Sequence, residues 1–424
     1  MVMHQSEHRD FPPSTILPFA VGFYFAFRFC IVLLSVQIFG TDPQTGSAMN
    51  LALNFAFLLL VAFCCPGRVR LPLEKMMRLA SIRWVMLFLG FSCLSLLWSG
   101  AASLPASFAY WCGMAADIAI VIILLRAGSV TPVTDSLMKG FVWGSCTVAL
   151  IAWIMPAQAD LRLGDEDFLG ANQIGYLCGF AFFLAQYLIR ERRGRFVVQS
   201  LFLAVTLLRT LSKTTIVAFL ISEGFLLISD KSMSRKSKIL VTFVAAVVVA
   251  ASWSLLDSYY EIYANAASQS VTLTGRLGIW GYLLAEAVQQ PWIGHGFDSI
   301  WKVVPSFGPE GFEAGHAHNE LLQQFYAYGL VGIFTFTGIY FSLYMQVRRL
   351  AKGSLRTFLL AFLLFVLVHG GAEAGRFDLL LPMWAIVMIS LLIDQACKVS
   401  EETPEAIAIR PIAFGNDASR SFGH

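Results

Sequence analysis

The stretch SFAYWCGMAADIAIVIILL, from Ser107 to Leu125, contains one charged residue, Asp117, among apolar and small residues. A bilayer has a hydrocarbon core of roughly 30 Å, and a helix of about 20 apolar residues spans it. The stretch therefore predicts a transmembrane helix. Similar apolar runs recur along the chain, so the pattern extends in both directions from this one.

The composition of the whole chain agrees with a membrane protein. Of its 424 residues, 57% are hydrophobic and 13% are charged, about half the charged fraction of an ordinary soluble domain. About twelve apolar runs can cross a bilayer, some of them short enough to require packing inside a bundle. The predicted fold is an all-α, polytopic integral membrane protein. The predicted spans are 16–39, 47–65, 82–98, 107–125, 137–155, 170–189, 196–210, 212–229, 239–256, 320–345, 357–369 and 379–396.

Lysine and arginine distribute unequally between the two sets of loops in this topology. The loops on one side carry 19 of them and the loops on the other side carry six. Because positive loops lie in the cytoplasm, both termini are predicted to be cytoplasmic. The basic residues are scattered rather than gathered in one patch, which argues against a nucleic-acid partner.

One outer loop, residues 257–319, is far longer than the others. Within it, apolar residues at helical spacing followed by Pro291 predict an amphipathic helix that lies against the membrane surface. The residues of that apolar face are Leu277, Trp280, Leu284 and Val288. The chain is thus divided into a cytoplasmic N-terminus (1–15), nine spans (16–256), the long loop (257–319), three spans (320–396) and a cytoplasmic tail expected to be disordered (397–424).

A compact polar cluster ends this loop, in GHAHNELLQQFYAYGLVG from Gly315 to Gly332. Histidine suits proton transfer near neutral pH, which makes His316 and His318 candidate catalytic bases. A loop histidine at a helix start is the structural alternative. A metal site completed by Glu313 or Glu320 is another, but no third ligand stands at a fixed helical spacing, so no metal is expected.

Three cations on the outer side run against the general charge bias. Arg276 stands at the start of the amphipathic helix, while Arg209 and Lys213 are four residues apart and share a helix face. A lone cation would be explained by contact with lipid phosphates. Three cations beside a histidine instead predict an anion site, in which Arg209 and Lys213 compete for one role and Lys213 is preferred.

Other polar groups in the outer loops have weaker claims. Arg376 lies near His369, Glu373 and Asp378, and is expected to pair with Asp378 or Glu373, with anion binding as the alternative. The triplet 165–167 (Asp-Glu-Asp) resembles a metal-nucleotide site but is equally typical of a solvated acidic loop. Asp42, in the first outer loop, is a possible carboxylate base.

Several of these motifs occur in order and together resemble one family. They are TGRLGIW (274–280), PWIGHGFDSIW (291–301) and HAHNELLQQFYAYGLVG (316–332), preceded by GANQIGY (170–176) and LSKTTIVAF (211–219). His318-Asn319, nine residues, Gly329, two residues and Gly332 match the pattern of the O-antigen ligase/polymerase superfamily. The resemblance covers roughly residues 165–335.

The resemblance implies a metal-independent, inverting glycosyltransferase without a cofactor. Its donor would be an undecaprenyl-diphosphate-linked oligosaccharide, used at the periplasmic face of the bacterial inner membrane. The family's essential histidine carries over to His318 and its loop arginine to Arg276. Its Ser-Arg pair is met here by Ser212-Lys213, where lysine keeps the charge but loses the planar, two-pronged contact of arginine. The residues expected to contact substrate are Arg209, Asn319, His316 and Arg376.

The resemblance leaves the acceptor open. Polymerisation of exopolysaccharide or O-antigen repeat units is preferred, and transfer of a finished glycan to lipid A-core or to another acceptor is the alternative. A chain-length regulator is a conceivable further partner besides the glycan acceptor and the lipid bilayer. A transporter or lipid flippase is the alternative from a different class, but it should carry its charges along a path within the spans. Here the mid-span charges are few: Arg28, Asp117 and Glu223.

Overall fold

The computed structural model describes residues 15–408, apart from several gaps. The gaps are Pro66, Arg68, 159–160, Glu166, 192–194, 232–233, Ser237, 240–242, 244–246, 248–249, 251–272 and 300–314. Most of the ninth predicted span, the middle of the long outer loop and the two ends of the chain therefore lie outside the described residues.

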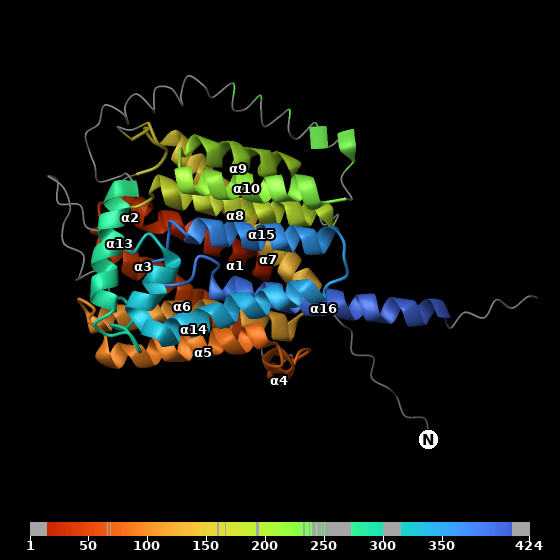
Figure 1. Ribbon diagram of the computed structural model, residues 1–424, viewed down its shortest axis with the longest axis horizontal. Coiled ribbons are helices and arrows are strands. Elements are labelled where there is room, and N and C mark those ends of the chain that lie inside the picture. Colours follow the sequence, from red (N-terminus) through yellow and green to blue (C-terminus); the bar gives the residue numbers. More distant parts are fainter. Residues whose placement is uncertain are drawn as a thin grey trace, which may run out of the picture.

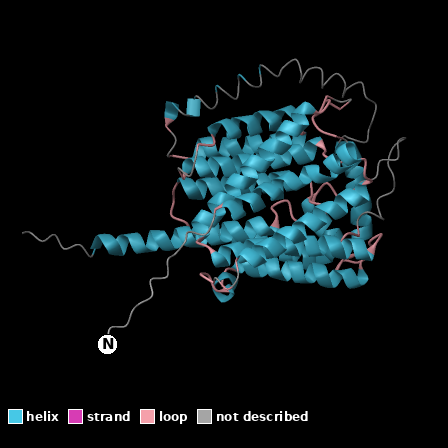
Figure 2. Cartoon of the chain, turned by 180° about the vertical axis from the view of Figure 1, so that it is seen from behind, coloured by secondary structure: helices cyan, strands magenta, loops and turns pink. Residues whose placement is uncertain are grey.

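The described chain is built from α-helices, which confirms the all-α part of the predicted fold, while the number of twelve spans stays a prediction (Figure 2). The β-pairing within it is an isolated bridge between Asp165 and Leu169. The helices are α1 (Ile16–Phe27), α2 (Ile31–Phe39), α3 (Pro43–Cys64), α4 (Leu73–Met77), α5 (Ala80–Leu94), α6 (Leu104–Ala127), α7 (Val130–Ile154), α8 (Ala171–Arg190), α9 (Val197–Arg209), α10 (Lys213–Ser229), α13 (Leu273–Ala287), α14 (Glu320–Arg349), α15 (Ser354–Gly370) and α16 (Met383–Ala408), with 3-10 turns at Arg28–Cys30 and Ser95–Trp98.

The long helices lie side by side in one bundle, and α13 runs across their ends (Figure 1). Six helical stretches in the described chain are long and apolar enough to cross a membrane, and shorter apolar helices such as α9 and α15 accompany them. Large apolar side chains point outward, among them Phe63, which is 85% exposed, and Ile228, which is 84% exposed. Such a surface belongs in lipid rather than water. The protein is a polytopic membrane protein.

The first predicted span contains a break that its composition does not reveal. A 3-10 turn at Arg28–Cys30 separates α1 from α2. Arg28 forms an ion pair of 2.5 Å with Asp117 of α6, whose side chain is 5% exposed. Each of these two mid-span charges is thus balanced by the other, as the low dielectric of a bundle interior requires.

Small residues let the first and seventh helices approach closely. A Cβ added at Gly22 of α1 would lie 1.9 Å from the Leu137 carbonyl oxygen, and one at Gly140 of α7 would lie 1.9 Å from the Phe19 carbonyl oxygen. Backbones in contact at small residues are a common way for helices to associate in membranes.

The helix that follows the histidine segment, α14, is interrupted at Gly329. This residue has φ of 61° and ψ of −152° inside α14. At the break, the Tyr326 and Ala327 carbonyls accept hydrogen bonds from the amides of His295 and Gly296, at 3.0 and 2.8 Å. The broken helix therefore binds the backbone of the preceding loop.

The two motif glycines make close contacts with the preceding loop and within α14 itself rather than with a neighbouring helix. A Cβ at Gly329 would lie 2.5 Å from the Trp292 carbonyl carbon, in the loop, and positive φ disfavours any other residue there. A Cβ at Gly332 would lie 2.4 Å from the Cβ of Tyr328, in its own helix. Gly329 therefore allows the break in α14 and its contact with the 291–296 loop, and Gly332 leaves room for Tyr328 next to the break.

The predicted amphipathic helix is α13, and it has two apolar faces. Ile279, Leu283 and Ala287 are buried and pack with Tyr326 of α14. Leu277, Leu284 and Val288 of the predicted face are 50–58% exposed. Trp280, the fourth residue of the predicted face, instead packs against the buried cluster and donates to the Ala317 carbonyl at 3.0 Å. The sequence pattern therefore identified three residues that point outward, while a second face, not predicted, attaches the helix to the bundle.

Candidate active site

The histidine segment is held in place by the start of α14. The Asn319 side-chain oxygen accepts a hydrogen bond from the Leu322 amide at 2.9 Å, so Asn319 is the N-cap of α14. Its amide nitrogen donates to the Gly371 carbonyl at 3.0 Å. Gln323 accepts from the Ala317 amide at 2.8 Å, between the two histidines. These contacts support His318 in a left-handed backbone conformation, with φ of 48°.

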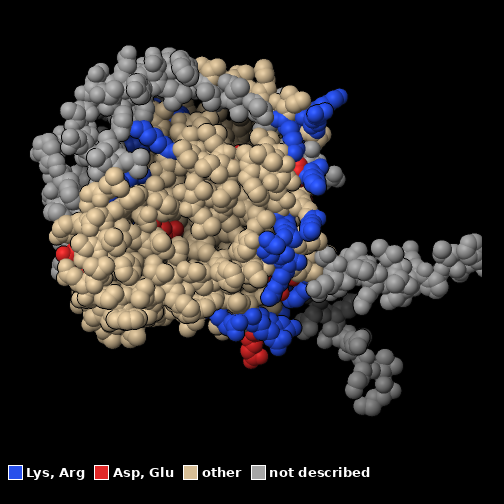
Figure 3. Space-filling model, in the orientation of Figure 1, with Lys and Arg blue, Asp and Glu red and all other residues tan. Residues whose placement is uncertain are grey.

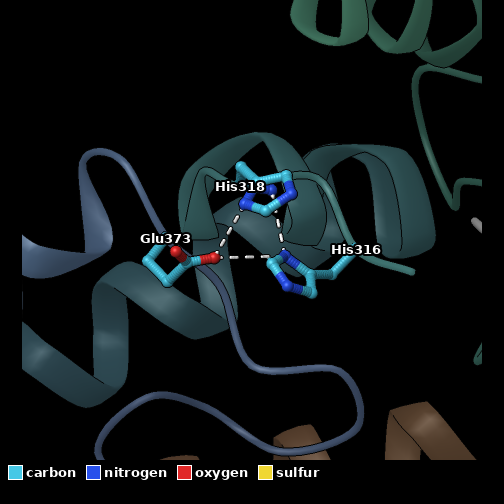
Figure 4. Close-up of side chains that lie close together, drawn as sticks. All are labelled: His316, His318 and Glu373. Carbon is cyan, nitrogen blue, oxygen red and sulfur yellow. Dashed lines mark hydrogen bonds and ion pairs between the residues drawn. The ribbon is translucent and has the colours of Figure 1, made fainter. Parts of the chain in front are cut away.

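His316, His318 and Glu373 converge on one point (Figure 4). His318 Nδ1 lies 2.9 Å from Glu373 Oε1, and His316 Nδ1 lies 3.4 Å from the same oxygen. Glu373 comes from the loop after α15, 55 residues away in sequence from His318. Sequence reasoning grouped Glu373 with Arg376 and did not connect it with the histidines.

Charges and burial fix the ionisation of two members of this cluster. Burial by itself would raise the pKa of Glu373, but the hydrogen bond from His318 and the charges of the histidines lower it to about 2. Burial lowers the pKa of His316 to about 4 despite the attraction of Glu373. At neutral pH Glu373 is therefore a carboxylate and His316 a neutral imidazole.

The hydrogen bonds also assign the ring protons. A carboxylate only accepts, so the group at His318 Nδ1 that faces Glu373 must be N–H. In the neutral ring, Nε2 of His318 then carries a free lone pair. His316 differs, because its Nδ1 accepts from the His318 amide at 3.2 Å. The environment thus prepares His318, rather than His316, to take a proton through Nε2.

The second carboxylate oxygen of Glu373 faces two donors. Asn172 Nδ2 of α8 donates to Oε2 at 3.0 Å, and Arg276 of α13 lies 3.5 Å from the same atom. Arg276 also donates to the Thr214 hydroxyl at 3.1 Å, at the start of α10. Glu373 therefore connects His318 to the predicted cation Arg276. Through Thr214, Arg276 also lies next to Lys213 in the fold.

Several cations gather at this point. Lys213 is the first residue of α10, and electrostatic repulsion from Arg162 and Arg276 acts on it. Arg162 donates to the Asn172 side-chain oxygen at 2.7 Å. Arg162 was not among the cations predicted for the anion site. Three cations near one helix N-terminus make this region strongly favourable for an anion.

Arg209 is held differently. It donates to the Leu161 carbonyl at 2.6 Å, and partial burial lowers its pKa. Leu161 and Leu211 both have positive φ, at 65° and 55°, so the loops on each side of this arginine are strained. Strain of this kind in bulky residues is typical of functional sites. The preference for Lys213 over Arg209 stays a prediction.

A chain of hydrogen bonds continues into the bundle from Asn172. The Ser212 hydroxyl donates to Asn172 at 2.9 Å and shares a hydrogen bond with Thr215, which contacts His369 Nε2 at 3.0 Å. His369 is fully buried against Tyr176. The motifs around Asn172 and Ser212, far apart in sequence, thus support one another behind the cations.

The remaining predicted groups lie in other surroundings. Glu373 pairs with Arg276, and Asp378 accepts from the Leu379 and Met383 amides. Pairing of Arg376 with either carboxylate stays a prediction. The Arg376 guanidinium lies 4.8 Å from the centre of the Phe377 ring. Asp42 accepts from the amide and hydroxyl of Thr45, which makes it the N-cap of α3 rather than a base beside the histidines.

The metal alternative takes a form that differs from the predicted one. His316, His318 and Glu373 offer three ligand atoms within 4.8 Å of one another. Glu320, one of the expected further ligands, instead accepts from the Leu380 amide at 2.7 Å, and Glu313 lies outside the described residues. Asp165 of the acidic triplet accepts from the amides of Asp167 and Phe168 and shapes its own turn.

Comparison with known proteins relates one part of the chain to a family. Residues 198–337, about a third of the chain, match the family described as O-antigen ligase (Wzy_C). The match contains Lys213, Arg276 and His318, and it ends before Glu373.

A curated relative points in the same direction. The chain is 25% identical over 301 residues to exopolysaccharide production protein ExoQ of Rhizobium meliloti (strain 1021). The alignment covers 64% of this chain and 66% of that relative, so the chain spans just under two thirds of the relative's length. The protein is a distant homologue of ExoQ.

Proposed function

We propose that this protein is an inner-membrane glycosyltransferase of the O-antigen ligase family that polymerises lipid-linked repeat units of an exopolysaccharide at the periplasmic face. The observation that carries the proposal is the His318–Glu373 pair, which leaves His318 Nε2 free as a base next to a group of cations. The name of the relative ExoQ favours exopolysaccharide over other glycans. Transfer of a finished glycan to lipid A-core is the alternative, since both reactions need the same base and the same cations.

The reaction requires a base for the acceptor hydroxyl and positive charge for the leaving diphosphate, and different residues of the site can supply them. His318 Nε2 takes the proton of an acceptor sugar hydroxyl while the oxygen attacks the anomeric carbon of the donor. The bond between that carbon and the diphosphate oxygen breaks, with inversion, and undecaprenyl diphosphate leaves. Arg276 and Lys213 stabilise the charge that develops on the diphosphate, with Arg209 as a further contact. Glu373 stabilises the tautomer of His318 and the charge that the ring acquires.

Asn319 and His316 support this arrangement in our proposal. Both amide atoms of Asn319 already bind backbone groups, so its contribution is to hold the start of α14 beside Gly371. His316 is neutral and accepts from the His318 amide, which suits contact with a substrate hydroxyl better than proton abstraction. Neither residue needs a metal for these roles, and the proposed mechanism uses none.

The proposed topology has about twelve spans, with both termini in the cytoplasm and residues 257–319 as the periplasmic catalytic loop. Figure 3 supports the orientation, because Lys and Arg gather at the end of the bundle opposite α13, with a smaller group near the α13 end. A reporter fused after Arg349 should report cytoplasm and one inserted at Ser306 the periplasm. A cytoplasmic signal at Ser306 would contradict the proposed catalytic loop.

Polymer formation by purified protein in lipid nanodiscs, from lipid-linked repeat units, tests the function. His318→Ala should lower turnover about 10²–10⁴-fold with nearly unchanged affinity for undecaprenyl diphosphate. Arg276→Ala and Lys213→Ala should weaken both, because a cation meets the diphosphate before and during bond cleavage. Lys213→Arg should retain much of the activity, since the family usually has arginine there.

Two results would contradict the proposal. If His318→Ala polymerises at the wild-type rate while His316→Ala is inactive, the base is misassigned. If a strain without the protein accumulates long lipid-linked chains rather than single repeat units, the protein is a ligase and not a polymerase.

A further inference from the structure

His369, at the end of α15, is a buried histidine that the proposed mechanism does not use. Its side chain is fully buried, and its ring centre lies 4.5 Å from that of Tyr176 in α8. Its Nε2 atom lies 3.0 Å from the Thr215 hydroxyl, whereas its Nδ1 atom has no hydrogen-bond partner among the described residues. Ionisable side chains are rare and costly inside membrane bundles, and where they occur they usually have a function.

Asn172 lies between this histidine and the proposed base, and its amide group can adopt only one orientation. Arginine only donates, so the Asn172 atom 2.7 Å from the Arg162 guanidinium is the amide oxygen. The amide nitrogen then faces Glu373 Oε2 at 3.0 Å and donates to it. The Ser212 hydroxyl is a second donor to the amide oxygen, at 2.9 Å, and helps to hold the amide in this orientation.

The hydrogen bonds between His369 and Asn172 therefore run in one direction. Ser212 uses its single hydroxyl proton in the bond to Asn172, so Thr215 must donate in the 2.9 Å contact with Ser212. Thr215 has then used its own proton, and the proton in its contact with His369 must come from Nε2. A proton on Nε2 also fits the lack of a partner at Nδ1, because a buried N–H group without an acceptor is costly.

Close packing of α8 against the start of α10 keeps this hydrogen-bond chain together. A Cβ added at Gly175 would lie 3.2 Å from the Cβ of Ser212 and 3.3 Å from the hydroxyl oxygen of Thr215. Ser212 and Thr215 are both fully buried, so water does not compete for their hydroxyl groups. Tyr176 donates to a backbone carbonyl at 2.7 Å, which holds its ring against His369.

We propose that His369 is a positioning residue for the transfer reaction, acting through the hydrogen-bond chain that ends at Asn172. The proton on its Nε2 sets the direction of the chain, and the chain keeps the amide nitrogen of Asn172 directed at Glu373. Glu373 in turn holds the ring proton of His318 on Nδ1 and leaves Nε2 free. The inference rests on the proposed function and adds to it a buried residue that acts on the base through other side chains.

Two substitutions of His369, compared in polymer formation by protein in nanodiscs, test the role. His369→Leu cannot donate to Thr215 and should lower kcat about five- to ten-fold, the size expected for the loss of one hydrogen bond. His369→Gln places an amide nitrogen near the Nε2 position, so it should stay within about two-fold of the wild type. In both variants the KM for the lipid-linked donor should change less than about two-fold, because the cations keep their places.

Ser212 and Ser222 provide a matched pair of substitutions in and near α10. Ser212→Ala breaks the chain in its middle with a smaller change and should lower kcat as His369→Leu does, which also keeps the test available if His369→Leu does not fold. Ser222 is fully buried too, but its hydroxyl has no partner among the described residues, so Ser222→Ala should keep the wild-type constants.

A double variant shows whether the effect passes through Glu373. If it does, His369→Leu combined with Glu373→Gln should be no slower than Glu373→Gln alone, because the carboxylate on which the chain acts is already lost. Losses that multiply in the double variant, or a rise in the donor KM of the single variants, would indicate general damage to the bundle and overturn the inference.

Failure of the inference and failure of the proposed function give different results. If the wild type forms polymer but His369→Leu and Ser212→Ala keep the wild-type kcat, or His369→Gln is as slow as His369→Leu, then His369 is not a positioning residue and the proposed function stands. If the wild type transfers no glycan at all, the proposed function fails and the inference fails with it.

Discussion

Replacing Glu373 with glutamine should inactivate the enzyme although it changes one atom of the side chain. Two donors, Asn172 Nδ2 at 3.0 Å and Arg276 at 3.5 Å, face Oε2, while His318 Nδ1 faces Oε1 at 2.9 Å. The glutamine oxygen will occupy the Oε2 position, because an NH₂ group there would oppose both donors. The NH₂ group then faces His318 Nδ1.

That orientation reverses the tautomer of His318. Nδ1 must now accept from the amide, so the ring proton moves to Nε2, where the proposed mechanism needs a lone pair. We expect turnover to fall by about 10²–10⁴-fold, equivalent to about 3–5 kcal/mol in the activation barrier. Affinity for undecaprenyl diphosphate should change little or increase, because Arg276 loses a neutralising carboxylate.

Polymer formation in nanodiscs measures this effect, and the double variant isolates it. If both residues act as one unit, Glu373→Gln combined with His318→Ala should be no slower than His318→Ala alone. Glu373→Asp keeps the acceptor-only carboxylate and should recover part of the rate. Wild-type turnover in Glu373→Gln, or strictly multiplicative losses in the double variant, would refute the tautomer argument.

Three further predictions follow from the described contacts. Gly329→Ala should lower the melting temperature strongly, at a cost above about 2 kcal/mol, since positive φ and a backbone 2.5 Å away both oppose a Cβ, whereas Gly281→Ala, with open space around it, should not. As the pH decreases from 6.5 to about 4, His316 becomes protonated in the unfolded chain before it does in the folded chain, so the free energy of unfolding should decrease. Melting temperatures measured over this pH range should therefore change less in His316→Gln than in the wild type. Below pH 4.5 the loss of stability should continue towards about pH 2 as Glu373 becomes protonated, and Glu373→Gln should remove this second part. Excess chelator should leave polymer formation unchanged, while loss of activity that zinc or magnesium restores would favour a metal at His316, His318 and Glu373.

The sequence by itself determined the membrane class and the position of most helices. Apolar runs have to match the bilayer thickness, so composition alone locates most of the described helices; short α4 and the outer helix α13 lie outside the predicted runs. The ends are less well predicted, because α7 begins at Val130, seven residues before its run, and α16 extends to Ala408, twelve residues beyond its run. Local rules also determined Asn319 as an N-cap and the helical nature of α13. These properties depend on neighbours in the chain and on the solvent, which the sequence specifies directly.

The tertiary structure decided which polar residues act together. Glu373 meets His318 across 55 residues, and Asn172 meets Glu373 across 201. No periodicity connects such positions, because the packing of α8, α10, α14 and α15 brings their ends together only once the bundle has formed. The same packing assigned Gly329 to a helix break rather than to a helix contact, since the carbonyls freed at the break require the 291–296 loop as a partner. The sequence names the candidate base and cations, but the carboxylate that sets the proton on the base becomes its neighbour only through the fold.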